Sequence, residues 1–163
     1  KPTYKNKVVD LVAIDDNKVI GFITVEINSE VVDVDKDYGF VWEFGVHRDY
    51  RGNGIGKRLI DKAHEIMRDK YDINKSLWYS QEERAQKYYE RLGMKEIERH
   101  WQFSVSPTKE QKEMFKRSKF DCWEMRGSCS VEDFEEVKKK YKIIEDDDAL
   151  KPHLCIGYEY IGE

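Results

Sequence analysis

The sequence contains little cysteine and little proline, with three residues of each type among 163. Because the cysteine count is odd, a scaffold stapled by disulfides is not expected, and a reducing cytoplasm is the default location. No apolar run approaches the roughly 18 residues of a membrane-spanning helix. The chain begins at Lys1 and shows no secretory signal pattern. We therefore expect a cytoplasmic protein without a membrane partner.

The sequence also lacks an excess of basic charge. Its 29 lysine and arginine residues stand against 33 aspartate and glutamate residues, which gives a net charge of -4. Proteins that bind nucleic acid usually carry a basic excess or a basic stripe. The run Lys138–Lys140 follows Glu135 and Glu136, a pattern typical of a solvated helix face. We expect no nucleic-acid partner.

Recognisable metal-binding motifs are missing as well. The candidate ligands are Cys122, Cys129, His153 and Cys155, and their spacing differs from that of a zinc knuckle. Buried thiols are the better interpretation of these cysteines. We therefore expect no metal ion.

The sequence does contain alternating β-type and amphipathic segments. Aromatic residues make up 13% of the chain, so a packed core is feasible although only 39% of the residues are apolar. The patterns predict strands at 7–14, 19–27, 40–46, 76–79, 94–105 and 154–161. They predict helices at about 54–70, from a capping box of Ser80 and Glu83 to a stop at Gly93, from about Pro107 to Ser118, and after Ser130. Residues 28–38 and the acidic run 145–148 are expected to be loops.

A glycine-rich segment, Arg51-Gly52-Asn53-Gly54-Ile55-Gly56, separates the third predicted strand from the first predicted helix. Glycines let the backbone approach an anion closely, and N–H groups at a helix N-terminus point toward it. The segment fits neither a P-loop nor the GxGxxG dinucleotide fingerprint. It predicts a phosphate-binding turn of another kind, and an ordinary glycine-rich helix cap is the alternative. Gly45, inside the preceding strand, indicates a bulge or a close backbone approach.

Two segments together resemble the GNAT superfamily of N-acetyltransferases. The run from Val46 to Gly56 is similar to motif A of that family, and the run from Ala85 to Met94 (AQKYYERLGM) is similar to motif B. Two motifs in the right order are more specific than either alone, and the resemblance covers roughly 7–105 plus the last strand. It implies an α/β, GNAT-like fold with a mixed, mostly antiparallel central sheet flanked by helices.

The resemblance also implies the cosubstrate, acetyl-CoA, and the residues that bind it. The backbone N–H groups of the turn would hold the CoA pyrophosphate, and the residues concerned are Arg51, Gly52, Asn53, Gly54, Ile55, Gly56 and Lys57. The backbone near Val46 would pair with the pantetheine arm, and an N–H there would polarise the thioester carbonyl.

Two residues are candidates for proton transfer. The resemblance implies that Tyr89 protonates the departing CoA thiolate, whose reference pKa is near ~8.5. Glu43 is our candidate for the base that deprotonates the attacking amine. In a regular strand it would lie on the opposite face from Val46, and a bulge at Gly45 would change that facing. A core position for Tyr89 and a solvated strand position for Glu43 are the alternatives.

The chain departs from the family pattern at two places. The family fold normally opens with a strand and two helices before the hairpin, which here starts at residue 7. The connection at about 106–150, usually a short turn, holds two predicted helices. We expect a single domain over 1–163 that lacks those first elements and carries a helical insertion before the last strand.

The leading functional hypothesis is transfer of an acetyl group from acetyl-CoA to the primary amine of a small molecule or a peptide. Residues 143–163 hold six carboxylates against Lys151 alone, which would favour a small cationic amine if this segment borders the acceptor site. A solvated loop is the alternative interpretation of that run. A non-catalytic acyl-CoA sensor or interaction domain and a nucleotide-phosphate binder are the alternative functions. A homodimer is left open.

Overall fold

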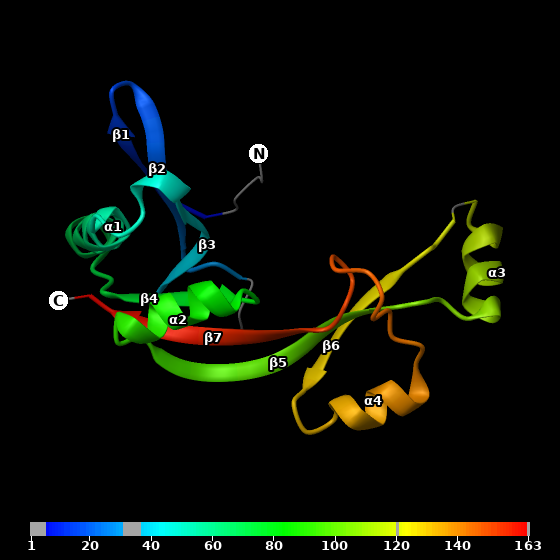
Figure 1. Ribbon diagram of the computed structural model, residues 1–163. Coiled ribbons are helices and arrows are strands. Elements are labelled where there is room, and N and C mark those ends of the chain that lie inside the picture. The colour runs from blue at the N-terminus through cyan, green and yellow to red at the C-terminus, as the bar shows by residue number, and fades with distance from the viewer. Residues whose placement is uncertain (1–5, 31–36, 120, 163) are drawn as a thin grey trace. The chain divides into compact units, whose positions relative to one another are not determined.

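The computed structural model describes residues 6–30, 37–119 and 121–162 (Figure 1). Residues 31–36 of the predicted loop and Glu163 of the acidic segment lie outside the described residues. Seven strands form a mixed sheet in the order β1-β2-β3-β4-β7-β5-β6, accompanied by four α-helices in the described part of the chain. The α/β class and the mixed sheet are confirmed.

The chain divides into two compact units, each described by itself. The first contains Lys1–Tyr79, Tyr89–Lys95 and Tyr158–Glu163, and the second contains Ser80–Tyr88 and Glu96–Gly157. The expectation of a single domain over 1–163 without the family's first elements stays a prediction.

The first unit opens with the predicted hairpin of β1 (Val8–Asp15) and β2 (Lys18–Ile27). The turn residues Asp16 and Asn17 have φ of 43° and 63°, as the tight turns that match strand twist require. On one face of the hairpin Ile23 and Val25 are buried, whereas Val12 on the other face is 55% exposed. The alternation of apolar and polar residues therefore correctly predicts which face of the hairpin is buried.

Strand β3 (Gly39–Val46) pairs antiparallel with β2 and contains a bulge. The register runs regularly from Gly21–Val46 to Thr24–Glu43 and then shifts, so that Val25 lies opposite Val41. Trp42 is the extra residue. The bulge expected at Gly45 is therefore misplaced by three positions, because Gly45 pairs in register with Phe22, whose ring lies over it.

Helix α1 (Ile55–Tyr71) packs against β1, β2 and β3 and supplies the centre of the core (Figure 1). Its residues Ile60, Ala63 and Met67 are completely buried. Strand β4 (Lys75–Ser80) then runs parallel to β3. Among the described residues these two strands are paired at Gly39–Ser76 and Phe40–Leu77, and not beyond. The expected separation of β3 from β4 toward Val46 is confirmed.

Helix α2 (Glu83–Arg91) begins in the second unit and ends in the first. Met94 N–H donates to Tyr89 C=O at 3.1 Å and Gly93 N–H donates to Glu90 C=O at 3.0 Å. Gly93 has a φ of 75°. These features make a Schellman motif, in which the predicted glycine stop holds the backbone of Tyr89.

The second unit contains β5 (Lys95–Val105), α3 (Lys109–Arg117), β6 (Met125–Ser130), α4 (Phe134–Lys140) and the start of β7 (His153–Ile161). Strand β6 pairs antiparallel with β5 from His100–Ser130 to Val105–Met125. We did not predict it, because its sequence MRGSCS does not alternate. Thr108 caps α3, so Pro107 precedes the helix and does not lie in its first turn.

Candidate active site

The glycine-rich segment forms a turn between the end of β3 and the start of α1. A short 3-10 helix covers Arg48–Tyr50, and Gly52 and Gly54 follow with φ of 86° and 74°. A Cβ atom on either glycine would meet nothing within 4 Å. Glycine is therefore required by the backbone conformation and not by crowding, and the space beside the turn is open.

The first turn of α1 presents backbone N–H groups at this open space. Gly54 is the N-cap, and the first intrahelical bond runs from Arg58 N–H to Gly54 C=O at 3.0 Å. The N–H groups of Ile55, Gly56 and Lys57 precede that bond, so helix geometry gives them no intrahelical acceptor. An anion at this end would also interact favourably with the helix dipole.

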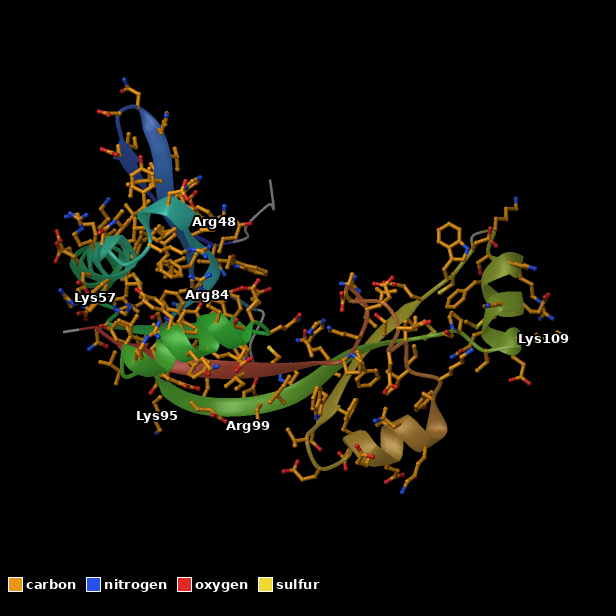
Figure 2. All side chains as sticks on the ribbon, viewed as in Figure 1. Arg48, Lys57, Arg84, Lys95, Arg99 and Lys109 are labelled. Carbon is orange, nitrogen blue, oxygen red and sulfur yellow. The ribbon has the colours of Figure 1, made fainter. Side chains whose placement is uncertain are left out.

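Cationic side chains lie along the same segment. Figure 2 labels Arg48 in the 3-10 helix and Lys57 in α1. The hydrogen bond with Asp61 is the main cause that raises the pKa of Lys57, so its ammonium is charged at neutral pH. Arg51 Nε donates to the carbonyl of Val46 at 3.0 Å. The predicted residues of the turn are therefore brought together at one end of α1.

The backbone of Val46 faces the edge where β3 has left β4. His47 N–H donates to Ile20 C=O at 2.8 Å, which makes this a hydrogen-bonded pair of the antiparallel ladder. The next pair, Gly21–Val46, is then a non-hydrogen-bonded pair. The N–H and C=O of Val46 consequently point away from β2, toward the side on which a parallel partner is absent at this position of the described chain.

Tyr89 lies in a cluster of aromatic rings in the first unit. Its side chain is 7% exposed. The ring centroids of Trp78 and Tyr158 are 5.2 and 5.6 Å from that of Tyr89, and Phe44 of β3 lies 5.4 Å from Trp78. Because Phe44 and Val46 share a face of β3, Tyr89 is brought to the Val46 side of the strand.

Glu43 lies on the other face of β3. The register between Glu43 and Val46 is regular, so their side chains point to opposite faces, as expected for a regular strand. Glu43 is exposed and lies opposite Thr24, whose hydroxyl donates to Asp10 Oδ1 at 2.6 Å. The structure therefore does not bring Glu43 and Tyr89 to one face of the strand.

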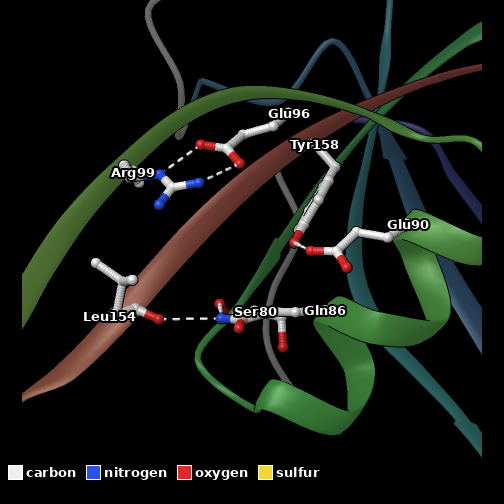
Figure 3. Close-up of polar contacts among 7 residues, drawn as sticks. All are labelled: Ser80, Gln86, Glu90, Glu96, Arg99, Leu154 and Tyr158. Carbon is white, nitrogen blue, oxygen red and sulfur yellow. Dashed lines mark hydrogen bonds and ion pairs between the residues drawn. The ribbon is translucent and has the colours of Figure 1, made fainter.

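Hydrogen bonds around motif B hold it to its neighbours within each unit (Figure 3). In the first unit the hydroxyl of Tyr158 donates to Glu90 Oε1 at 3.3 Å. In the second unit the amide of Gln86 donates to the carbonyls of Ser80 and Leu154 at 2.9 and 3.0 Å. Sequence reasoning missed Tyr158 and Trp78 as neighbours of Tyr89. Their buried, alternating positions in strands were the available signal.

Two further observations concern metal ions and membranes. Within residues 6–30, 37–119 and 121–162 no group of three or more His, Cys, Asp or Glu side chains could hold a metal ion. None of the described helices is both long and apolar enough to cross a membrane. The absence of a metal stays a prediction, and so does a cytoplasmic location.

A family model described as "Acetyltransferase (GNAT) family" matches residues 4–94. That range contains the hairpin, β3, the glycine-rich turn, α1, β4 and α2. No curated protein sequence shows a significant match to the chain.

Solved structures share the fold at low sequence identity. An acetyltransferase from Bacillus cereus ATCC 14579 is 15% identical with a TM-score of 0.53, covering 95% of this chain and 73% of that protein. The ribosomal-protein-S18-alanine N-acetyltransferase of Escherichia coli is 12% identical with a TM-score of 0.52, covering 96% and 70%. A proposed streptothricin acetyltransferase from Bacillus anthracis str. Ames, solved with acetyl coenzyme A, is 18% identical with a TM-score of 0.52, covering 97% and 65%.

Proposed function

The chain belongs to the GNAT acetyltransferase family, and from that premise we propose that it transfers the acetyl group of acetyl-CoA to the primary amine of a small molecule. The observation that carries the proposal is the junction of β3, the glycine-rich turn and α1. There an open space, a helix N-terminus and the outward-facing backbone of Val46 lie at one end of the first unit.

The turn would hold the pyrophosphate of CoA through backbone N–H groups. Gly52 and Gly54 adopt positive φ and leave the space beside them open. The N–H groups of Ile55, Gly56 and Lys57 lie at the positive end of the α1 dipole. Asn53 Nδ2 donates to Tyr50 C=O at 3.4 Å, so we assign this side chain to the support of the turn.

The edge of β3 at Val46 would receive the pantetheine arm. The arm would occupy the place of a paired strand, because the N–H and C=O of Val46 face the edge that β4 has left. The Val46 N–H would then donate to the thioester carbonyl oxygen and stabilise the charge that develops there. Arg51, bonded to the Val46 carbonyl, would keep the end of the strand fixed.

Tyr89 would act as the general acid. The neutral amine attacks the carbonyl carbon of the thioester, and its lone pair forms the new C–N bond. The C–S bond breaks, its electron pair goes to sulfur, and the tyrosine hydroxyl gives its proton to that thiolate. The nitrogen of the new amide gives up its surplus proton to bulk water, and the tyrosinate regains a proton from water after CoA has left. The aromatic cluster that contains Trp78 and Tyr158 would keep water away from the hydroxyl while the proton moves to sulfur.

Glu43 would accept the proton that the acceptor ammonium must lose before attack. Because Glu43 lies on the face opposite Val46, this proton would travel through water. Asp10, in line with Glu43 across the β1–β2–β3 ladder, adds a second exposed carboxylate on that face. Such a face attracts cations, which favours a small amine over an acidic peptide.

The decisive experiment measures CoA release against a panel of polyamines, aminoglycosides, amino-acid esters and lysine peptides. With the best acceptor, Tyr89→Phe should lower kcat about 10²- to 10³-fold because the general acid is lost. Acetyl-CoA affinity should stay within about twofold, since the ring and its contacts remain. Tyr88→Phe, at the neighbouring tyrosine of motif B, is the matched control and should keep kcat.

Two outcomes would contradict the proposal. If the parent chain binds acetyl-CoA but releases no CoA with any amine, the chain is an acyl-CoA sensor. If ATP binds more tightly than CoA, the turn holds a nucleotide triphosphate, and the assignment of the turn is wrong.

A further inference from the structure

A buried polar cluster lies beside the aromatic rings that surround Tyr89, and the proposed reaction does not use it. His64 of α1 is 2% exposed and Ser76 of β4 is 1% exposed. Their Nε2 and Oγ atoms are 2.8 Å apart. Trp78, two positions further along β4, donates its indole N–H to the same Ser76 Oγ at 2.7 Å. All three residues belong to the first unit.

The direction of these hydrogen bonds follows from the chemistry of the groups. An indole N–H can only donate, so Ser76 Oγ accepts from Trp78. The Ser76 hydroxyl can still donate to His64 Nε2, or accept from it through its second lone pair. Burial is the main cause that lowers the pKa of His64 to about 4, against an opposing contribution of the Asn74 backbone. The imidazole is therefore neutral at pH 7 and suits either arrangement.

The indole of Trp78 connects this cluster to Tyr89. Trp78 is 1% exposed, and its ring packs against Tyr89 at 5.2 Å with an interplanar angle of 56°. On the β3 side, Phe44 meets it edge-on at 5.4 Å and 85°. The bond to Ser76 allows one orientation of the indole, because a flipped ring would leave its N–H buried without an acceptor.

We propose that Ser76 and His64 are positioning residues for Tyr89, and that they act through Trp78. The inference rests on the proposed function, in which Tyr89 delivers a proton to the CoA thiolate. Ser76 fixes the indole, His64 fixes the hydroxyl of Ser76, and the indole face determines where the phenol ring of Tyr89 rests. The Schellman motif at Gly93 already fixes the Tyr89 backbone, and the packing of the Tyr89 ring on Trp78 and Tyr158 helps to set where the hydroxyl lies.

Purely apolar side chains at positions 64 and 76 would fill the same space without fixing the orientation of the Trp78 indole. Burying a serine and a histidine costs free energy that their mutual hydrogen bonds must offset. His64 Nδ1 is buried and makes no hydrogen bond of regular geometry within the described chain; the Asn74 backbone is the main polar group that opposes the burial effect. The cluster therefore adds little to the stability of the fold. Its contribution is a defined orientation of the Trp78 indole.

The test is a double-mutant cycle in the full chain, with acetyl-CoA and the best amine of the panel. Ser76→Ala removes the acceptor for the indole, and Ser76→Thr keeps a hydroxyl there. We expect Ser76→Ala to lower kcat about tenfold, with acetyl-CoA affinity and acceptor KM within about twofold. Ser76→Thr should recover most of kcat. Ser104→Ala, at a serine 3% exposed in the second unit, is the matched control for loss of a buried hydroxyl.

The combination with Tyr89→Phe separates positioning from stability. If Ser76 acts through the Tyr89 hydroxyl, the double variant Ser76→Ala/Tyr89→Phe should turn over no more slowly than Tyr89→Phe alone. A merely structural role predicts that the two losses multiply. If Ser76→Ala unfolds the chain, His64→Gln, which keeps a side-chain partner for Ser76, gives the same comparison against His64→Leu.

Each failure has its own signature. An active parent enzyme whose Ser76→Ala and His64→Leu variants keep kcat would overturn the positioning role and leave the proposed function intact. A parent chain that releases no CoA with any amine would overturn the proposed function itself, and the positioning role with it.

Discussion

The two compact units are stabilised by different means. In the first unit, helix α1 buries Ile60, Ala63 and Met67 completely against strands β1 to β3. In the second unit, the buried apolar side chains among the described residues are Phe134, Cys155 and Ile156. Local hydrogen bonds, such as the capping box of α3 between Thr108 and Gln111, contribute more to the stability of that unit. The comparison indicates that buried apolar side chains stabilise the first unit, whereas strand pairing and local hydrogen bonds contribute more to the stability of the second.

We expect the largest loss of stability from removal of the aromatic ring at the centre of the second unit. Phe134 stacks on Trp101 at 4.6 Å and contacts Phe103 at 5.8 Å. Phe134→Ala should lower the free energy of unfolding by about 3 kcal/mol, because a buried ring is deleted from a small core. Hydrogen exchange should accelerate at the amides of β5, β6 and α4, while acetyl-CoA affinity stays unchanged.

Phe22→Ala provides the control for that experiment. Phe22 is 40% exposed on the first unit, so its removal should cost about 1 kcal/mol or less. If Phe134→Ala is no more costly than Phe22→Ala, the second unit is not centred on the Phe134 ring.

The acid stability of the chain tests the burial of the first unit. The pKa of His64 is lowered to about 4 by burial, compared with an ordinary value of 6.5. Between these two pH values the unfolded chain binds a proton that the folded chain does not bind. Stability should therefore fall as the pH is lowered from about 6.5 to 4, by up to about 3 kcal/mol from this group.

Urea unfolding of the parent and of His64→Gln at pH 7 and pH 4.5 measures this effect. Gln does not titrate, so the variant should lose less stability between the two pH values. Parallel losses in the two proteins would show that other groups cause the acid sensitivity.

A smaller effect should come from the glycine-rich turn. Gly54 has a φ of 74° with open space around it. Gly54→Val forces a β-branched side chain into the left-handed region, which costs about 1–2 kcal/mol. If the parent turn binds the pyrophosphate, relaxation of this strain should weaken acetyl-CoA binding about tenfold by calorimetry.

Gly93→Val is the control for Gly54→Val, because the two glycines have similar backbone conformations. Gly93 has a φ of 75°, and a Cβ atom added there would also meet nothing within 4 Å. It should lose similar stability and keep acetyl-CoA affinity. Equal acetyl-CoA affinities in the two variants would show that the pyrophosphate does not bind at the glycine-rich turn.

The smallest expected effect concerns the acidic run of the second unit. Asp148 is paired with Lys151 at 2.7 Å, and Asp147 Oδ1 accepts from the Ala149 N–H at 2.8 Å. The Lys151 ammonium compensates one of the three aspartate charges, which weakens the negative field that could attract a cationic amine. Changing Asp146, Asp147 and Asp148 to Asn should raise the KM for a cationic amine by about twofold at low salt, and less at moderate salt. An unchanged KM at both salts would assign the run to a solvated loop.

Sequence reasoning succeeded where burial imposes a period on the chain. The hairpin of 7–27, the helix from Ile55 and the glycine stop at Gly93 all follow from apolar spacing or turn chemistry. Strand β6 was missed because Arg126, Gly127 and Ser128 are exposed in succession, and pairing with β5 defines the strand. Tertiary pairing of this kind leaves no mark on the local sequence.

For the same reason, one part of the candidate site was predicted from the sequence and another part was missed. The turn residues are contiguous, so the sequence alone placed them together. The neighbours of Tyr89 come from β4 and β7, and sequence patterns do not give the register between those strands. The bulge was assigned to Gly45 on residue type, whereas the structure places it at Trp42, whose indole N–H is held by Glu26 Oε2 at 2.7 Å.

The bulge at Trp42 has a consequence for sequence alignment and protein design. Phe40 stacks on Tyr79 and Phe44 packs on Trp78, so two residues four positions apart on β3 point to opposite faces. An alignment of β3 with a strand that lacks the bulge will exchange the faces of Glu43 and Phe44, unless it places a one-residue gap at Trp42. A design that deletes Trp42 would restore a regular strand, and every residue on one side of the deletion would change face. Homologues should therefore be compared at this strand by ring contacts before any acidic residue is equated with Glu43.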